Sequence, residues 1–158
     1  MKTQINLFII TLLFLFLTAC ASVDYSQQAE FPEAKPDQAL IYFYRTPGFI
    51  GSTYRFNIFE EDNLVGAMAQ DSYFYLFTSA GEHTYSVNDQ YKEQGSFIKM
   101  EVQAGKVYYV KVDVEYQVFG GKPIFTSVDH VEASKLLSSR KYVVPTKVNA
   151  STYNVHAE

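Results

Sequence analysis

The chain has 158 residues, of which 47% are apolar, and 13 Lys and Arg against 17 Asp and Glu give a formal net charge of −4. This length predicts one domain, and the apolar fraction is too high for a disordered chain. The weakly acidic balance argues against a nucleic-acid-binding protein, which would need clustered Lys and Arg. The single cysteine, Cys20, excludes an internal disulfide framework and a cysteine-based zinc site.

Residues 1–19 are predicted to be an export signal rather than part of the fold. Lys2 precedes an apolar run from Ile5 to Leu17 that only two polar residues interrupt, and small residues follow the run. A charged start, a short apolar run and a small-residue cleavage site are the three parts of a secretory signal peptide. The run is shorter than the ~20 residues that a membrane-spanning helix needs, so we expect cleavage and export.

The end of this signal, Leu17, Thr18, Ala19 and Cys20, resembles the lipobox of bacterial lipoproteins. The resemblance implies cleavage before Cys20 and transfer of diacylglycerol to its sulfur, because a thiol is the nucleophile of that reaction. Two acyl chains, of the palmitate type, would anchor the protein stably, at ~0.8 kcal/mol per buried methylene. The residue after the cysteine is Ala21 rather than Asp. By the same resemblance, this implies that the protein is sorted to the periplasmic face of the outer membrane. Alternatively, Ala19-Cys20-Ala21 matches an ordinary A-x-A cleavage site, which would release a soluble periplasmic protein.

The mature chain is predicted to have three parts. Residues 20–37 are polar and contain two prolines, so we expect a flexible tether that begins at the lipidated Cys20. The folded domain is expected at residues 38–140. Residues 141–158 carry no strong pattern and are predicted to be a polar C-terminal tail, extended or disordered.

Residues 38–140 consist mostly of strand patterns. The continuous apolar run at 39–44 is typical of a strand buried on both faces. Shorter patterns, most of which alternate apolar and polar residues, predict the other strands, at 53–58, 64–68, 73–77, 83–87, 97–102, 107–114 and 124–128. Asp129 is placed to cap a helix over 131–139. Seven or eight strands and one C-terminal helix predict a mostly β fold, an antiparallel β-sandwich or a half-open barrel.

The sequence shows no pattern of catalytic or metal-binding residues. His83, His130 and His156 lie 47 and 26 residues apart, without a metal-ligand spacing such as H-x-x-H, and no G-x-S-x-G motif occurs. We therefore expect no enzymatic activity, no metal and no cofactor. The alternative is a hydrolase that acts on envelope polymers, and its sign would be a Ser or Asp side chain from another strand at hydrogen-bonding distance from His83.

Tyrosines form the most prominent candidate binding surface. The run from Tyr73 to Phe77 is apolar on both faces, so this strand is either covered on both sides or exposed as a patch. A tyrosine offers an apolar ring and a polar tip, which suits glycan or protein contacts. Tyr73, Tyr75 and Tyr109 are the residues that we expect to form such a surface, and a glycan-binding module is a further alternative.

Six short segments carry a family resemblance, at 39–45, 48–52, 64–66, 72–74, 80–84 and 104–109. From Gln38 to about Leu137 they resemble the bacterial family known as domain of unknown function 2846. The hairpin followed by a Gly-Glu-His turn also resembles PEGA-type β modules. The resemblance implies a β fold, and the family has no established catalytic residues. We therefore expect a lipid-anchored envelope protein whose non-catalytic periplasmic β-domain binds an envelope protein or glycan or has a structural role.

Overall fold

The computed structural model describes residues 31–48, 52–89, 94–117, 120–143 and 148–149. The predicted signal peptide, the lipobox residues Leu17, Thr18 and Ala19, the predicted lipidation site Cys20 and His156 lie outside the described residues. Of the helices in the described ranges, none is long and apolar enough to cross a membrane.

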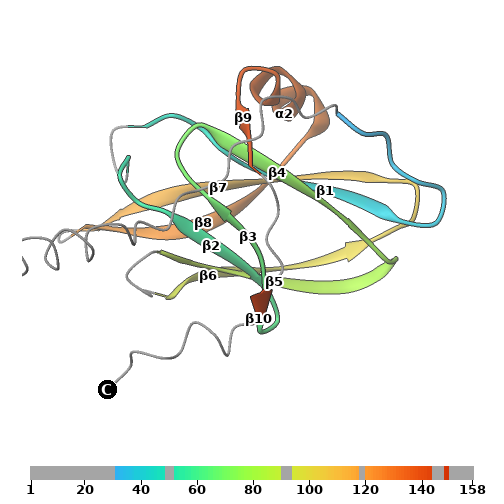
Figure 1. Ribbon diagram of the computed structural model, residues 1–158, viewed down its shortest axis with the longest axis horizontal. Helices are drawn as coiled ribbons and strands as arrows, with labels where there is room; N and C mark the ends of the chain where they lie inside the picture. The colour runs from blue at the N-terminus through green and yellow to red at the C-terminus, as the bar shows by residue number, and fades with distance from the viewer. Residues whose placement is uncertain (1–30, 49–51, 90–93, 118–119, 144–147, 150–158) are drawn as a thin grey trace, which may run out of the picture.

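The described residues form two five-stranded sheets, packed face to face as a β-sandwich, with one helix on an outer face (Figure 1). The first sheet has the order β8-β7-β1-β4-β9, with the bounds Gly120–Val128, Val107–Gln117, Ala39–Arg45, Ser72–Thr78 and Lys141–Tyr142. The second sheet has the order β10-β3-β2-β5-β6, with the bounds Val148–Asn149, Asn63–Met68, Phe56–Glu60, Gly81–Asp89 and Gln94–Val102. Helix α2 spans His130–Leu137. The predicted mostly β fold with a C-terminal helix is confirmed, as two sheets rather than a closed barrel.

The sheets are not wholly antiparallel, contrary to the prediction. Strand β1 runs parallel to β7, with Leu40 opposite Val107, and β4 runs parallel to β9. The other pairs described are antiparallel. Parallel partners need a long connection, and here the whole of the second sheet except β10 separates β1 from β7. Neighbouring patterns in the sequence suggest hairpins, so they could not indicate a pair formed by such distant segments.

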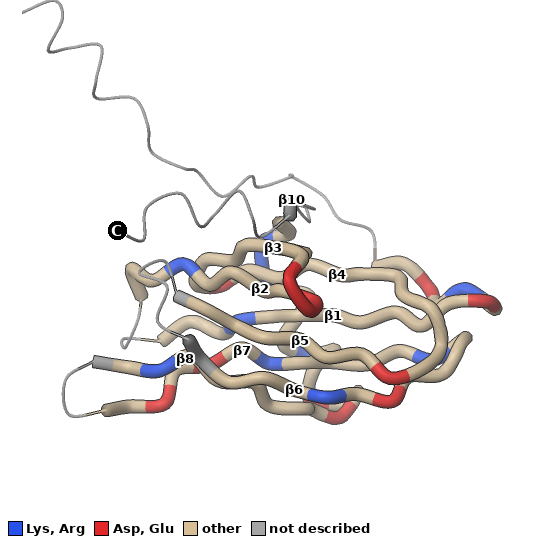
Figure 2. Tube along the Cα trace, turned by 90° about the horizontal axis from the view of Figure 1, so that it is seen from below, with Lys and Arg blue, Asp and Glu red and all other residues tan. Residues whose placement is uncertain are grey.

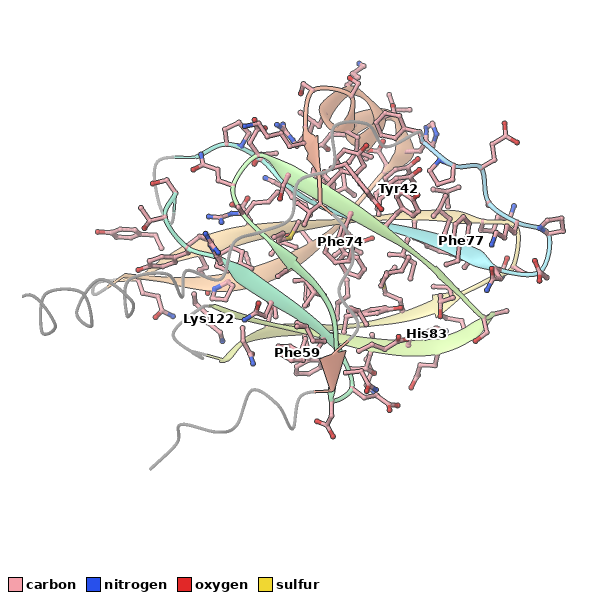
Figure 3. The ribbon with its side chains drawn as sticks, in the orientation of Figure 1. Tyr42, Phe59, Phe74, Phe77, His83 and Lys122 are labelled. Carbon is pink, nitrogen blue, oxygen red and sulfur yellow. The ribbon has the colours of Figure 1, made fainter. Side chains whose placement is uncertain are left out.

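Strand β1 has apolar cores on both of its faces. All seven of its side chains are buried, as the continuous apolar run predicts. Alternation directs Phe43 into the space between the sheets and Tyr42 to the outer face. Between the sheets, in what we call the interior core, Phe43 stacks on Phe74 with ring centroids 5.2 Å apart, and Tyr85 meets Phe43 edge-on at 5.1 Å. Figure 3 shows Phe74 in this interior and Tyr42 nearer the helix.

Helix α2 begins where the capping pattern predicts. The Asp129 side chain accepts hydrogen bonds from the backbone amides of Val131, at 2.8 Å, and Glu132, at 3.1 Å. Ala133 and Leu137 are the buried residues of the helix, and they pack on the outer face of the first sheet. Val131, in the first turn of the helix, is 63% exposed.

The turns follow local chemistry. Strands β2 and β3 are joined by Glu61 and Asp62, which lie in the red segment of the β2–β3 turn in Figure 2. Gly81 is the first residue of β5, and Gly105 lies in the turn before β7. Their φ angles are +135° and +75°. Those angles are strained for residues with a Cβ atom, which explains glycine at both positions.

Both ends of the predicted domain extend into segments that were expected to be unstructured. Residues 31–37, in the predicted tether, lie against the first sheet, where Ala34 packs on the outer apolar cluster. In the predicted tail, Lys141–Tyr142 pairs with Ser72 and Tyr73 as β9, and Val143 donates its backbone amide to the Tyr73 carbonyl at 2.8 Å. Val148–Asn149 forms β10. Two-residue strands leave no periodicity in a sequence, so only the partner strand reveals them.

Candidate functional site

The outer face of the first sheet carries a tyrosine cluster, which we define as Tyr42, Tyr73, Tyr75, Tyr109 and Tyr142. Strand register brings it together, because Tyr42 stands opposite Tyr75 on β4 and opposite Tyr109 on β7. The Tyr42 and Tyr109 rings are stacked with centroids 5.4 Å apart and planes at 9°. Tyr75 lies 5.7 Å from Tyr42 and stacks on Tyr142 at 5.4 Å. The structure therefore joins the three predicted surface tyrosines to two others.

This cluster is largely covered. The Phe31 ring stacks on Tyr73 at 5.4 Å and 10°, and the Tyr42 hydroxyl donates a hydrogen bond of 3.2 Å to the Pro32 carbonyl. The exposed fractions of Tyr73 and Tyr109 are 3% and 8%, whereas Tyr75 is half-buried. Of the two arrangements that the sequence left open for this strand, the structure has the covered one.

Burial sets the protonation of these phenols. It raises the pKa of Tyr42, Tyr73 and Tyr109 above the ordinary value of 10.0. Burial and then a hydrogen bond with Tyr75 raise the pKa of Tyr142 to about 12. These four phenols are thus neutral at physiological pH, and none of the four is activated as a base or nucleophile.

A cavity of about 580 Å³ opens beside the tyrosine cluster, and we call it the helix-side cavity. Its walls come from three places in the chain, namely residues 31–34, the outer face of β1 and β7, and helix α2. Phe31, Val107 and Leu137 supply apolar wall, while Glu33 and His130 are polar lining groups. The His130 ring meets Tyr109 edge-on, with centroids 5.5 Å apart. The volume lies in the range of about 300–1,000 Å³ that small-molecule sites occupy.

His83, on β5, forms a second polar group on the other sheet (Figure 3). Its Nδ1 lies 2.6 Å from Glu60 Oε1, on β2, and its Nε2 lies 2.9 Å from the Ser79 carbonyl oxygen. The Thr78 hydroxyl stands 3.3 Å from both ring nitrogens. A cavity of about 410 Å³ lies beside this group, lined by polar residues such as Glu61 and Glu82.

The His83 geometry does not form a catalytic triad. A triad needs a nucleophile on the nitrogen opposite the carboxylate, and here a backbone carbonyl occupies that nitrogen. Thr78 is equidistant from both nitrogens, so its hydroxyl is not aligned with either one to lose a proton. The predicted sign of a hydrolase was a Ser or Asp side chain from another strand, and the side-chain partners described for His83 are Glu60 and Thr78.

His130 lies on the helix that covers the first sheet, and His83 lies on a strand of the second sheet. The two histidines line different cavities and do not share a site. Within the described ranges, no group of three or more His, Cys, Asp or Glu side chains is arranged to hold a metal ion.

The sequence analysis missed Tyr42 and Phe31 as members of the aromatic face. Tyr42 lies in a run with no polar residue, so its direction follows only from the strand pairing. Phe31 lies in a segment without periodicity, and only tertiary contact with Tyr73 places it. The aromatic run from Tyr73 to Phe77 was the signal that indicated the face.

The protein is thus a two-sheet β-sandwich whose aromatic outer face is covered by a helix and an N-terminal segment. The chain belongs to the family described as "Protein of unknown function (DUF2846)", which matches residues 35–124. It is also similar to a protein of Haemophilus influenzae described as "Uncharacterized protein", with 30% identity over 136 residues, covering 82% of this chain and 79% of that protein. The family match includes every strand from β1 to β7 and ends within β8, before helix α2.

Proposed function

We propose that this protein is a lipid-anchored component of the bacterial cell envelope, held by Cys20 on the periplasmic face of the outer membrane. One observation carries the proposal: the single cysteine of the chain follows Leu17, Thr18 and Ala19 at the end of a signal-like apolar run. A thiol at that position is what diacylglycerol transfer requires, and two acyl chains anchor a protein stably.

The β-sandwich domain, in this proposal, has a binding or structural role and no catalytic activity, with an envelope protein or glycan as its partner. The capped His83 nitrogen and the unaligned Thr78 hydroxyl support a structural role for that group. The cavity beside the stacked tyrosines supports a binding role for the other face. The β2–β3 hairpin and the turn at Gly81 support a PEGA-like β module as the fold type.

Replacement of the thiol tests the anchor. Cys20→Ser should abolish metabolic labelling by a fatty-acid analogue and leave unprocessed precursor, because the acceptor sulfur is gone. Labelling is read on gels after pulse labelling, and mass spectrometry of the mature amino terminus identifies the modification.

Ala21→Ser is the matched control, since it changes the next residue and keeps the sulfur. Normal processing of Cys20→Ser, or a bare thiol in the wild-type protein, would contradict lipidation. Ala21→Asp tests the membrane assignment separately: the lipidated protein should move from outer-membrane to inner-membrane fractions in a density gradient, and an unchanged distribution would contradict sorting by this residue.

A further inference from the structure

We propose that the helix-side cavity binds a single uncharged acyl chain, and that the chain attached to the protein's own Cys20 is its occupant. The second part rests on the proposed lipid anchor, and the first part stands on the cavity itself. Three observations lead to this assignment: the surface of the walls, the orientation of the rings and the position of the amino-terminal segment.

The walls suit an aliphatic chain. Phe31, Ala34, Val107 and Leu137 give the cavity apolar surface, and its volume of about 580 Å³ is that of a small-ligand site. Polar side chains also line the cavity, among them Glu33, and His130 and Ser134 from α2. Such a lining removes methylene groups from water and leaves a polar linkage near hydrogen-bonding side chains.

The ring orientations disfavour a sugar. A glycan site needs an aromatic face free to stack on a pyranose ring. Tyr42 and Tyr109 turn faces toward one another, stacked at 5.4 Å and 9°, and both are almost fully buried. Phe31 stacks one of its faces on Tyr73 and is 49% exposed, so a sugar would find one partly exposed ring rather than a pair of free faces. An alkyl chain makes no such directional demand, because it needs only apolar surface.

The amino-terminal segment brings the acyl group to the cavity. Phe31, in the cavity wall, lies eleven residues after Cys20. Eleven residues span at most ~40 Å when extended, so a group attached to Cys20 lies within reach of the cavity. A ligand on so short a connection has an effective concentration of about millimolar, so even a weak site would be occupied.

Charge favours a chain with a neutral linkage. Glu33 is a lining residue and would repel the carboxylate of a free fatty acid. An ester or amide carbonyl carries no charge and accepts hydrogen bonds from hydroxyl or imidazole groups. An acyl chain on a lipidated cysteine has such a linkage.

A photo-crosslinkable acyl chain tests the assignment in the protein as it exists. Cells are fed a diazirine-bearing fatty acid, and the intact membranes are illuminated. Crosslinks from Cys20 to peptides containing Val107 or Ser134 are expected, and Ser134→Trp, which fills the cavity, should reduce their yield at least fivefold. Ser139→Trp is the matched control: both serines donate to the carbonyl three residues earlier, but Ser139 is not part of the lining.

The outcomes separate the two proposals. Failure of Cys20 to incorporate the fatty acid would overturn the proposed anchor. Incorporation followed by crosslinks to membrane lipid alone, or equal crosslink yields in both Trp variants, would overturn the cavity assignment and leave the anchor intact. If Ser134→Trp does not fold, as judged by its circular dichroism, Ser134→Leu replaces it as the smaller filling residue.

Titration of an added ligand tests the cavity without the anchor. The mature chain with Cys20→Ser keeps every residue that the structure describes, and we expect it to bind 1-decanoylglycerol at one site by isothermal titration calorimetry. Ser134→Trp should weaken binding at least tenfold, whereas Ser139→Trp should not change it. Absence of binding, or tighter binding of an N-acetylglucosamine trimer than of decanoylglycerol, would overturn the acyl-chain assignment.

Discussion

The two faces of the first sheet are both apolar, but they are covered in different ways. The inner face packs against a second sheet, and the strands on both sides form long ladders. The outer face is covered by short pieces from the two ends of the domain, namely residues 31–37 and helix α2. The comparison indicates that the interior core determines whether the protein folds, whereas the outer cover can open locally and can accommodate a ligand.

The largest effect should come from the interior core. Phe74→Ala removes a fully buried ring that stacks on Phe43, so we expect a loss of about 3–5 kcal/mol in the free energy of unfolding. Urea denaturation followed by circular dichroism measures it. Phe97→Ala, at a side chain that is 69% exposed, is the matched control and should change stability by less than about 0.5 kcal/mol. Similar losses in both variants would contradict the position of the core.

The outer cover should respond less. Leu137→Ala removes a buried contact between α2 and the first sheet, with an expected cost of about 2 kcal/mol, at the low end for a leucine truncation. Native-state hydrogen exchange should show lost protection in α2 and β9 while β1 and β5 stay protected. Uniform loss across both sheets would mean that the two faces unfold together. Val131→Ala, at an exposed site on the same helix, is the control.

The helix cap should contribute still less. Asp129→Ala removes the acceptor of two backbone hydrogen bonds, and we expect a loss of about 1 kcal/mol. Asp129→Asn keeps an oxygen acceptor and should recover most of this loss in thermal melts. If Asn and Ala destabilise equally, the cap does not act through the hydrogen bonds that the structure shows.

At neutral pH, replacement of Tyr142 should have the smallest effect on stability. This effect should grow only at alkaline pH. The folded-state pKa of Tyr142 is raised from 10.0 to about 12, so the native protein holds this proton more tightly than the unfolded chain does. The contribution of Tyr142 to the free energy of unfolding is therefore complete below pH 10 and is lost as the pH rises from 10 to 12. Tyr142→Phe should leave stability at pH 7 nearly unchanged and make the alkaline decline shallower.

Denaturation midpoints at several pH values measure this difference. Tyr116→Phe, at a side chain that is 71% exposed, should keep the wild-type pH profile. An unchanged alkaline decline in Tyr142→Phe would show that other groups, such as Tyr42 or Tyr109, account for it.

Local patterns were sufficient for much of the fold. Continuous apolar residues at 39–44 predicted a strand buried on both faces, and β1 is that strand. Alternation and turn residues located the other long strands, and Asp129 located the start of the helix. The parallel pairing of β1 with β7 was not predictable, because it depends on contacts between residues more than sixty positions apart.

The candidate site was predictable only in part. The apolar run from Tyr73 to Phe77 indicated an aromatic face, but not the cover that Phe31 and α2 place over it. Glu60 and His83 looked unrelated in the sequence, and strands β2 and β5 bring them to 2.6 Å. Neither the cover nor the hydrogen bond between Glu60 and His83 leaves a local pattern, since each joins segments that are distant in the chain.

By itself, the sequence determined the periodicities that make strands, the glycines at the positive-φ positions of two turns and an apolar fraction sufficient for a folded core. The tertiary structure alone decided which tyrosines share a face, what covers them and that a cavity remains beside the helix. The physical reason is the distance along the chain over which each effect acts. Backbone preferences and side-chain alternation depend on neighbouring residues, whereas a surface or a cavity is formed by side chains from several strands, whose pairing depends on the whole chain.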